Sequence, residues 1–201
     1  MLKREILWRQ IADDVLEGRR TTFHQRALAA ELGMSLGNVN LALEPLRAVG
    51  AASVVGKHLV VRDVRKVLLL WAARRQPSRP LVAFTPMEHA RDLARVLPPG
   101  LALTSFAGFV ARYGDEPAPF SVARAYVRAD DQATLLELRR RFSESPDVGA
   151  ATLIVHEADS VMARDLPEIV GPAQLYVDLW MEADFFASDY LRALEGRLAL
   201  Q

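Results

Sequence analysis

The prolines of this chain are distributed unevenly, and this distribution constrains its fold more than any other sequence feature. Ten of the 11 prolines in the 201 residues lie at or after Pro77. Because proline is disfavoured inside helices, the segment before Pro77 is free to be mostly helical. After it, short β-prone runs alternate with helical patterns. We therefore predict an α/β (α+β) chain with two domains, residues 1–76 and residues 77–201.

The first domain is predicted to begin with three helices, each followed by a glycine. They cover residues 2–17 before Gly18, residues 23–32 before Gly33, and residues 36–49 before Gly50. Thr22 and Gln25 have the spacing of a capping box for the second helix, and Ser35 is expected to cap the third. Pro45 falls inside the third helix, so we expect a kink there or a regular helix that ends near Glu44.

Two β-prone runs follow, over residues 52–55 and 58–61. Gly56-Lys57 between them matches the two-residue turn of a type II′ hairpin. Asp63 is expected to cap a fourth helix over residues 64–75, whose Val67, Leu68 and Trp71 should face the core. The order helix, helix, short turn, helix, hairpin is typical of a winged helix-turn-helix, a fold that places its second turn-linked helix in the major groove of DNA.

The predicted third helix separates into an apolar and a polar face. Its apolar residues at helical spacing, expected to pack inward, are Leu36, Val39, Leu43 and Leu46. The candidate DNA-binding residues are Arg26, Ser35, Gly37, Asn38, Asn40, Arg47, Lys57 and His58. Among them, either asparagine can pair with adenine, the amides at the helix start can meet phosphate, and the basic side chains are phosphate candidates.

The charges of the chain are strongly polarised although its formal net charge is zero. Residues 1–79 contain 14 Lys and Arg against 7 Asp and Glu, a net charge of +7, whereas residues 80–201 contain 11 against 18, a net charge of −7. A basic first domain favours a double-stranded DNA operator as its partner over the alternative, a winged helix that serves only protein–protein contacts. The acidic second domain is expected to engage a protein partner.

The second domain is predicted to alternate strands and helices. The expected strands cover residues 81–84, 101–103, 121–128, 151–156 and 174–180, and the expected helices cover residues 86–96, 104–114, 130–142 and 184–200. Arg139-Arg140-Arg141 ends one of these helices, and we favour a solvated helix end over a second DNA contact.

Two resemblances accompany these patterns. Residues 25–35 (QRALAAELGMS), with Val39, Leu43, Leu46 and Gly50, resemble the prokaryotic winged-helix pattern. Residues 103–108 (LTSFAG), 151–155 (ATLIV) and 174–179 (QLYVDL) resemble the C-terminal region of the AbiEi-type antitoxins of type IV toxin–antitoxin systems. This resemblance implies a winged helix joined to a degenerate nucleotidyltransferase-like domain, and a repressor of its own operon that counteracts a partner toxin.

Catalysis is not expected. A nucleotidyltransferase needs a Gly-Ser turn followed by paired carboxylates that hold magnesium, and the sequence contains neither Gly-Ser nor Asp-x-Asp. The absence of cysteine removes thiol nucleophiles and Cys-ligated metals. His89 with Asp92, and His156 with Asp159, form no known metal-ligand set, and no Gly-rich phosphate loop occurs, so we predict no cofactor and no metal. The longest apolar run, residues 67–73, is far below the roughly 20 residues of a membrane helix, and we expect a cytoplasmic protein. A ligand-sensing regulator and, less favoured, a nucleotidyltransferase-like enzyme are the alternatives.

Overall fold

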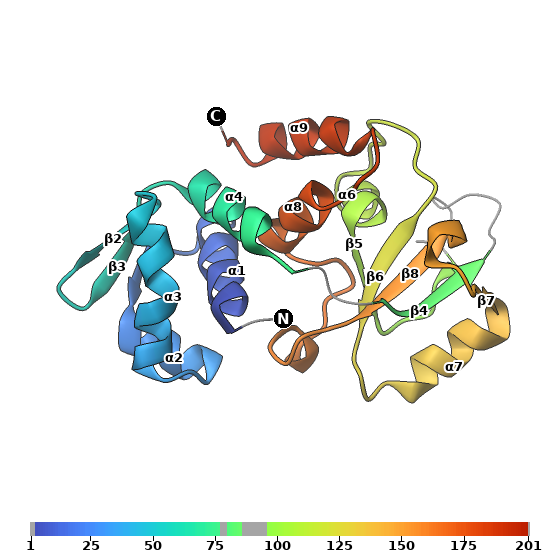
Figure 1. The fold of residues 1–201 in the computed structure, drawn as a ribbon, viewed down its shortest axis with the longest axis horizontal. Coiled ribbons are helices and arrows are strands. Elements are labelled where there is room, and N and C mark those ends of the chain that lie inside the picture. Colours follow the sequence, from blue (N-terminus) through green and yellow to red (C-terminus); the bar gives the residue numbers. More distant parts are fainter. Residues whose placement is uncertain (1–2, 77–79, 86–95, 201) are drawn as a thin grey trace. The chain divides into compact units, whose positions relative to one another are not determined.

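The computed structural model describes residues 3–76, 80–85 and 96–200. This part of the chain is a mixed α/β structure that contains a three-stranded and a five-stranded sheet (Figure 1), which confirms the predicted class. The residues group into two compact units. The first comprises residues up to Gln76 together with Gly171–Val177 and Leu200, and the second comprises Pro77–Val170 and Asp178–Ala199. The sequence boundary at residue 76 did not assign Gly171–Val177 and Leu200 to the first unit.

The first unit contains four helices of the N-terminal segment and a small antiparallel sheet. Its elements are α1 (Lys3–Leu16), β1 (Thr22–His24), α2 (Gln25–Leu32), α3 (Leu36–Ala48), β2 (Ala52–Val55), β3 (His58–Val61) and α4 (Val64–Arg74). Gly33 ends α2 in the left-handed conformation, with a φ of 63°. Ser35 and Asp63 accept hydrogen bonds from the amides of Asn38 and Lys66 and so cap α3 and α4, as predicted.

The predicted capping box at Thr22 is wrong. Thr22–His24 forms β1, which pairs antiparallel with β3, and α2 begins only at Gln25 without a side-chain cap. The pairing sets Phe23 opposite Leu59, and both are almost fully buried. Burial of a phenylalanine together with a strand ladder outweighs one capping hydrogen bond.

Of the two alternatives for Pro45, a regular helix that ends near Glu44 is wrong, because α3 continues through Pro45 to Ala48. Leu43 and Leu46 flank the proline and are buried, so packing holds the last turn in place. The missing amide of Pro45 leaves the Leu41 carbonyl without its usual partner. Leu41 is 63% exposed, so water can satisfy that carbonyl.

Two tryptophans anchor the core of the first unit. Trp8 on α1 and Trp71 on α4 are fully buried, and the indole N–H of Trp8 donates to the Ala42 carbonyl of α3 at 2.7 Å. The predicted inward residues Val67 and Leu68 are buried as well. These contacts fix α3 on the helices beside it, and thereby fix which of its faces meets solvent.

The second unit is built on a mixed five-stranded sheet with the order β5-β6-β8-β4-β7. Its elements are β4 (Pro80–Thr85), β5 (Leu101–Thr104), α6 (Ser105–Tyr113), β6 (Ala123–Val127), α7 (Gln132–Arg141), β7 (Ser143–Glu144), η2 (Val148–Ala150), β8 (Leu153–Glu157), η3 (Met162–Arg164), the end of α8 (Pro172–Trp180) and α9 (Ala187–Arg197). Strands β6 and β8 are parallel, and the other paired neighbours are antiparallel. The predicted helix over 86–96 falls, except for its last residue, outside the described residues.

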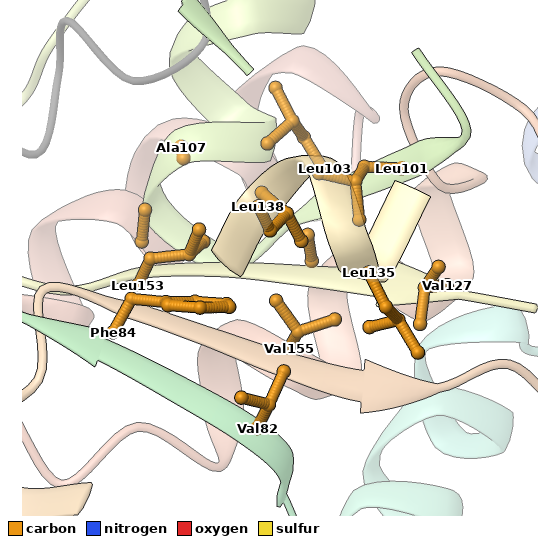
Figure 2. Close-up of a cluster of buried hydrophobic side chains, with 12 residues drawn as sticks. Val82, Phe84, Leu101, Leu103, Ala107, Val127, Leu135, Leu138, Leu153 and Val155 are labelled. Atoms are coloured by element: carbon orange, nitrogen blue, oxygen red, sulfur yellow. The ribbon is translucent and has the colours of Figure 1, made fainter. Parts of the chain in front are cut away.

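One face of this sheet forms a closed apolar core with α7 (Figure 2). Leu135 and Leu138 of α7 point onto Phe84, Val127 and Val155 of the sheet. Because side chains alternate along a strand, the intervening residues project from the opposite face. Several of these residues are polar, namely Thr104, Arg124, Tyr126 and His156.

The predicted strand over 174–180 is a helix, α8, which begins at Pro172. Residues 172–179 are all buried, and in this mostly apolar segment only Gln174 and Asp178, four positions apart, indicate a helical period. Pro172 directly after Gly171 was the overlooked signal, since proline favours the first position of a helix. On α1, an Asp13 carboxylate oxygen accepts the Ala173 amide at 2.8 Å and caps this helix start.

In the part of the chain that the structure describes, no helix has the length and apolarity that a membrane crossing requires.

Candidate nucleic-acid interface

The eight predicted site residues all belong to the first unit, and all are exposed. Arg26 lies on α2. Ser35, Gly37, Asn38, Asn40 and Arg47 lie at the start and along α3, and Lys57 and His58 lie on the β2–β3 hairpin. The eight residues are therefore surface positions carried by two helices and a hairpin.

The buried residues of α3 identify its inward face, and the residues opposite them form its outward face. Val39, Leu43 and Leu46 are at most 1% exposed, which confirms their predicted inward packing. Leu36 is 38% exposed, so its predicted inward packing is wrong. Leu36 is the first helical residue, directly after the Ser35 cap, and at this end of α3 its side chain remains partly exposed to solvent.

The outward face of α3 presents hydrogen-bonding side chains around one apolar residue. Asn38, Asn40, Leu41 and Glu44 are exposed along it. An asparagine can form a bidentate pair with adenine, a glutamate can accept from cytosine, and an apolar side chain can contact the thymine methyl group. Leu41 was not among the candidate DNA-binding residues, although its 63% exposure makes it the most exposed large apolar side chain of α3.

The start of α3 offers backbone donors to an anion. Ser35 Oγ accepts the Asn38 amide at 3.2 Å, which satisfies one of the amides that the helix leaves open at its start. The amides of Leu36 and Gly37 precede it and have no intrahelical acceptor. A Cβ atom added to Gly37 would approach only Ser35 Oγ, at 3.9 Å, so the surface around Gly37 is open to close approach.

Three basic side chains on this surface are unpaired. In the described part of the chain, Arg26, Arg47 and Lys57 make no side-chain hydrogen bond or ion pair, although each is exposed. A cation that satisfies no carboxylate of its own chain remains available to phosphate.

Two other arginines of the first unit are committed to the fold. Arg19 Nε and Arg20 Nε contact the two oxygens of the buried Asp14 at 2.7 and 2.6 Å, and Arg20 also reaches Glu31 at 2.6 Å. The hydrogen bond to Glu31 is the main cause that raises the pKa of Arg20. The net charge of +7 in the first 79 residues therefore includes two kinds of cation. Arg19 and Arg20 are held by carboxylates of the fold, whereas Arg26, Arg47 and Lys57 are not. Counting charges in the sequence does not distinguish the two kinds.

The hairpin carries Lys57 at its tip. Val55 pairs with His58 across a two-residue turn, and Gly56 has a φ of 61°, which confirms the predicted two-residue hairpin. His58 lies beside His24 of β1, with ring centroids 5.2 Å apart. Sequence reasoning missed His24 because it assigned that residue to a helix start.

The second unit holds a buried polar network on the sheet face opposite α7. Asp178 accepts hydrogen bonds from Thr104 Oγ1 at 2.6 Å and from Tyr126 at 3.0 Å. Glu182 accepts from Ser105 Oγ at 2.5 Å and from Arg124 Nε at 2.6 Å. Both carboxylates are thus engaged by side chains of the sheet and of α6. Within the described ranges, no group of three or more His, Asp or Glu side chains could hold a metal ion.

The three arginines at the end of α7 are held by carboxylates. Arg139 contacts Glu144, Arg141 contacts Glu137 at 2.7 Å, and Arg140 lies 4.0 Å from Glu137. These ion pairs leave the α7 end less available to phosphate than the surface of the first unit.

A cavity of about 560 Å³ opens at the β5 end of the second unit. The described residues that line it include Leu101, Leu103 and Ile169, with Glu168 as the one ionisable group among them. Its size is that of a small-molecule site.

No family model, curated protein or solved structure matches this chain.

Proposed function

We propose that this chain is a DNA-binding transcriptional repressor whose first unit is a winged helix-turn-helix. In this proposal α3 enters the major groove, and the β2–β3 hairpin is the wing that follows the adjacent phosphates. The observation that carries the proposal is the uncommitted cations Arg26, Arg47 and Lys57 around an outward α3 face that bears Asn38 and Asn40. Phosphate contacts of the cations would position the helix, and base contacts of the asparagines would select the site.

The second unit is proposed to be a degenerate nucleotidyltransferase-like domain without catalysis. The Thr104-Ser105 turn joins β5 to α6, and β6 next to it carries Arg124 and Tyr126 on its polar face. A metal-dependent transferase needs carboxylates on such a strand. A guanidinium and a phenol cannot hold magnesium, which supports a role other than catalysis.

We extend the proposal to an antitoxin that represses its own operon and counteracts a partner toxin. This part depends on the resemblance of residues 103–108 and 151–155 to AbiEi-type antitoxins and on the −7 net charge of residues 80–201, which favours a basic partner. The third resembling segment, residues 174–179, is helical. The test is co-expression with the product of the neighbouring reading frame: relief of its growth inhibition supports an antitoxin, and unchanged inhibition contradicts one.

DNA binding is tested by fluorescence anisotropy with a duplex from the region upstream of the gene and a scrambled duplex of the same length. We expect the upstream duplex to bind at least about tenfold more tightly. Arg47→Ala and Lys57→Ala should weaken binding to both duplexes. Arg192→Ala is the control, because the Arg192 side chain is 81% exposed but lies on α9 beside Asp189. Binding that is insensitive to salt, or equal in wild type and both variants, contradicts the proposal.

A repressor that senses a small molecule is the second candidate, and the cavity lined by Leu101, Leu103 and Glu168 favours it. Small apolar cations, which suit an apolar wall with one carboxylate, are the class to screen by thermal shift. Ala111→Trp at the exposed rim of this cavity should abolish any shift. A shift that survives this substitution would place the ligand elsewhere.

A further inference from the structure

Two of the four histidines of this chain meet on the small sheet of the first unit. His24 of β1 and His58 of β3 are direct partners in the antiparallel register. Their ring centroids lie 5.2 Å apart at an interplanar angle of 74°. His58 is exposed and His24 is half-buried. Within the described residues, neither imidazole makes a hydrogen bond or ion pair, so their nitrogens remain open to a ligand.

The strand ladder brings these two side chains to their closest approach. The amide of Gln25 donates to the Lys57 carbonyl at 3.1 Å, and the amide of Val61 donates to the Thr21 carbonyl at 2.9 Å. Because hydrogen-bonded and non-hydrogen-bonded pairs alternate along an antiparallel ladder, the His24–His58 pair is of the non-hydrogen-bonded type. Side chains of such pairs are closer together than those of the hydrogen-bonded pairs.

The histidines project from the solvent side of this sheet. Phe23 and Leu59, the neighbouring pair in the ladder, are at most 1% exposed. Successive side chains of a strand alternate between the two faces of the sheet. The imidazoles are therefore held by a ladder whose other face is anchored in the core. Such a support orients two ligands before any metal arrives.

We propose that His24 and His58 together bind one divalent transition-metal ion of the class that prefers imidazole: Zn²⁺, Ni²⁺ or Cu²⁺. An imidazole nitrogen binds zinc at about 2.1 Å, which puts each ring centroid about 3.2 Å from the metal. Two rings at angles of about 90° to 109° around one metal then have centroids about 4.5 to 5.2 Å apart. The observed 5.2 Å lies at the tetrahedral end of this range.

The metal gains its remaining ligands from water or from a bound partner. Because His58 is exposed, its ring can turn about the Cβ–Cγ bond, which leaves the ring centroid nearly in place, and present a nitrogen to the metal without disturbing the core. The bound ion links β1 to β3 and places two further positive charges beside Lys57. Mg²⁺ and Ca²⁺ are excluded, since both prefer oxygen ligands.

The test is isothermal titration of the full chain with ZnCl₂, and with MgCl₂ in parallel, in the absence of DNA. We expect one Zn²⁺ per chain and no binding of Mg²⁺. His24→Gln and His58→Gln should each weaken Zn²⁺ binding at least tenfold, whereas His89→Gln should bind as wild type. Zn²⁺ should also raise the melting temperature of the wild type and not that of either variant, because a ligand stabilises only the state that binds it.

His58→Gln is the decisive variant, because its exposed side chain leaves the core intact, and far-UV circular dichroism checks its fold. A wild type that binds no Zn²⁺ at about 1 mM, or a His58→Gln variant that binds like the wild type, would overturn the metal site. Loss of binding in His89→Gln would overturn it as well. Each of these results leaves the DNA-binding proposal untouched, since no DNA is present in the titration.

Discussion

Ser35 Oγ accepts the backbone amide of Asn38 at 3.2 Å, which fixes the first turn of α3 while the Asn38 side chain remains exposed. Ser35 supplies the helix cap, and Asn38 supplies an outward-facing side-chain carboxamide. The stability of the helix start therefore depends on the Ser35 side chain, and the recognition chemistry depends on the Asn38 side chain. Substitution of one residue tests stability, and substitution of the other tests recognition.

Ser35→Ala removes the cap and leaves the surface residues of α3 in place. We expect a loss of about 1 kcal/mol in the free energy of unfolding, measured by urea denaturation. Ser35→Asn is the matched control, because asparagine caps helices as well as serine does, and it should unfold like wild type. An alanine variant as stable as wild type would show that the cap contributes nothing.

Pro45→Ala should stabilise the chain. The alanine amide can donate to the Leu41 carbonyl and continue the α3 ladder, which an interior proline interrupts at a cost of up to about 3 kcal/mol. Urea denaturation measures the gain. Glu44→Ala, at the exposed neighbouring position, should change stability by less than about 0.5 kcal/mol. A destabilised Pro45→Ala variant would mean that the proline shapes α3 in a way the core requires.

Glu5 of α1 is predicted to make stability depend on pH. It is 2% exposed, and burial raises its pKa above the ordinary value of 4.5, an effect that the charge of Arg75 partly opposes. Because folded Glu5 then holds its proton more tightly than unfolded Glu5, the contribution of this group to stability is fully present below pH 4.5 and is lost as pH rises through the raised pKa.

Glu5→Gln should remove this pH dependence. Urea midpoints measured from pH 4.5 upward should decline with pH more steeply in the wild type than in the variant. Parallel profiles for the two proteins would show that Glu5 does not titrate differently in the folded and unfolded states.

Asn38→Ala and Asn40→Ala test base recognition separately from phosphate binding. A bidentate asparagine–adenine pair discriminates by about 1–3 kcal/mol, so one or both variants should lose affinity for the upstream duplex and keep the wild-type affinity for a scrambled duplex. Anisotropy titrations with both duplexes supply the comparison. An equal loss on both would assign the asparagines to backbone contacts.

Local signals in the sequence predicted much of the first unit. The Ser35 and Asp63 caps and the Gly33 and Gly56 turns each depend on residues within four positions, and all four are confirmed. The assignment of Thr22–His24 failed because a partner strand more than 30 residues away decides its conformation. Local capping rules contain no information on such pairing.

The wrong strand over 174–180 has a related cause. Every residue from 172 to 179 is buried, and only Gln174 and Asp178, four positions apart, indicate a helical period. Two polar positions in so short a segment are a weak signal for a helix. The cap of α8 comes from Asp13, which is remote in sequence and could not be found by a local search. The eight candidate site residues are all exposed, but which cations are held by carboxylates depends on contacts such as Arg20–Glu31, which a local search of the sequence does not find.

The salt dependence of DNA affinity tests the central claim most directly. Each phosphate contact contributes about −0.9 to the slope of log K against log salt concentration. The triple variant Arg26→Ala, Arg47→Ala, Lys57→Ala should therefore have a slope about 2.7 smaller in magnitude than that of the wild type, while Arg192→Ala keeps the wild-type slope. Equal slopes for the wild type and the triple variant would contradict the claim that these three cations contact DNA phosphates.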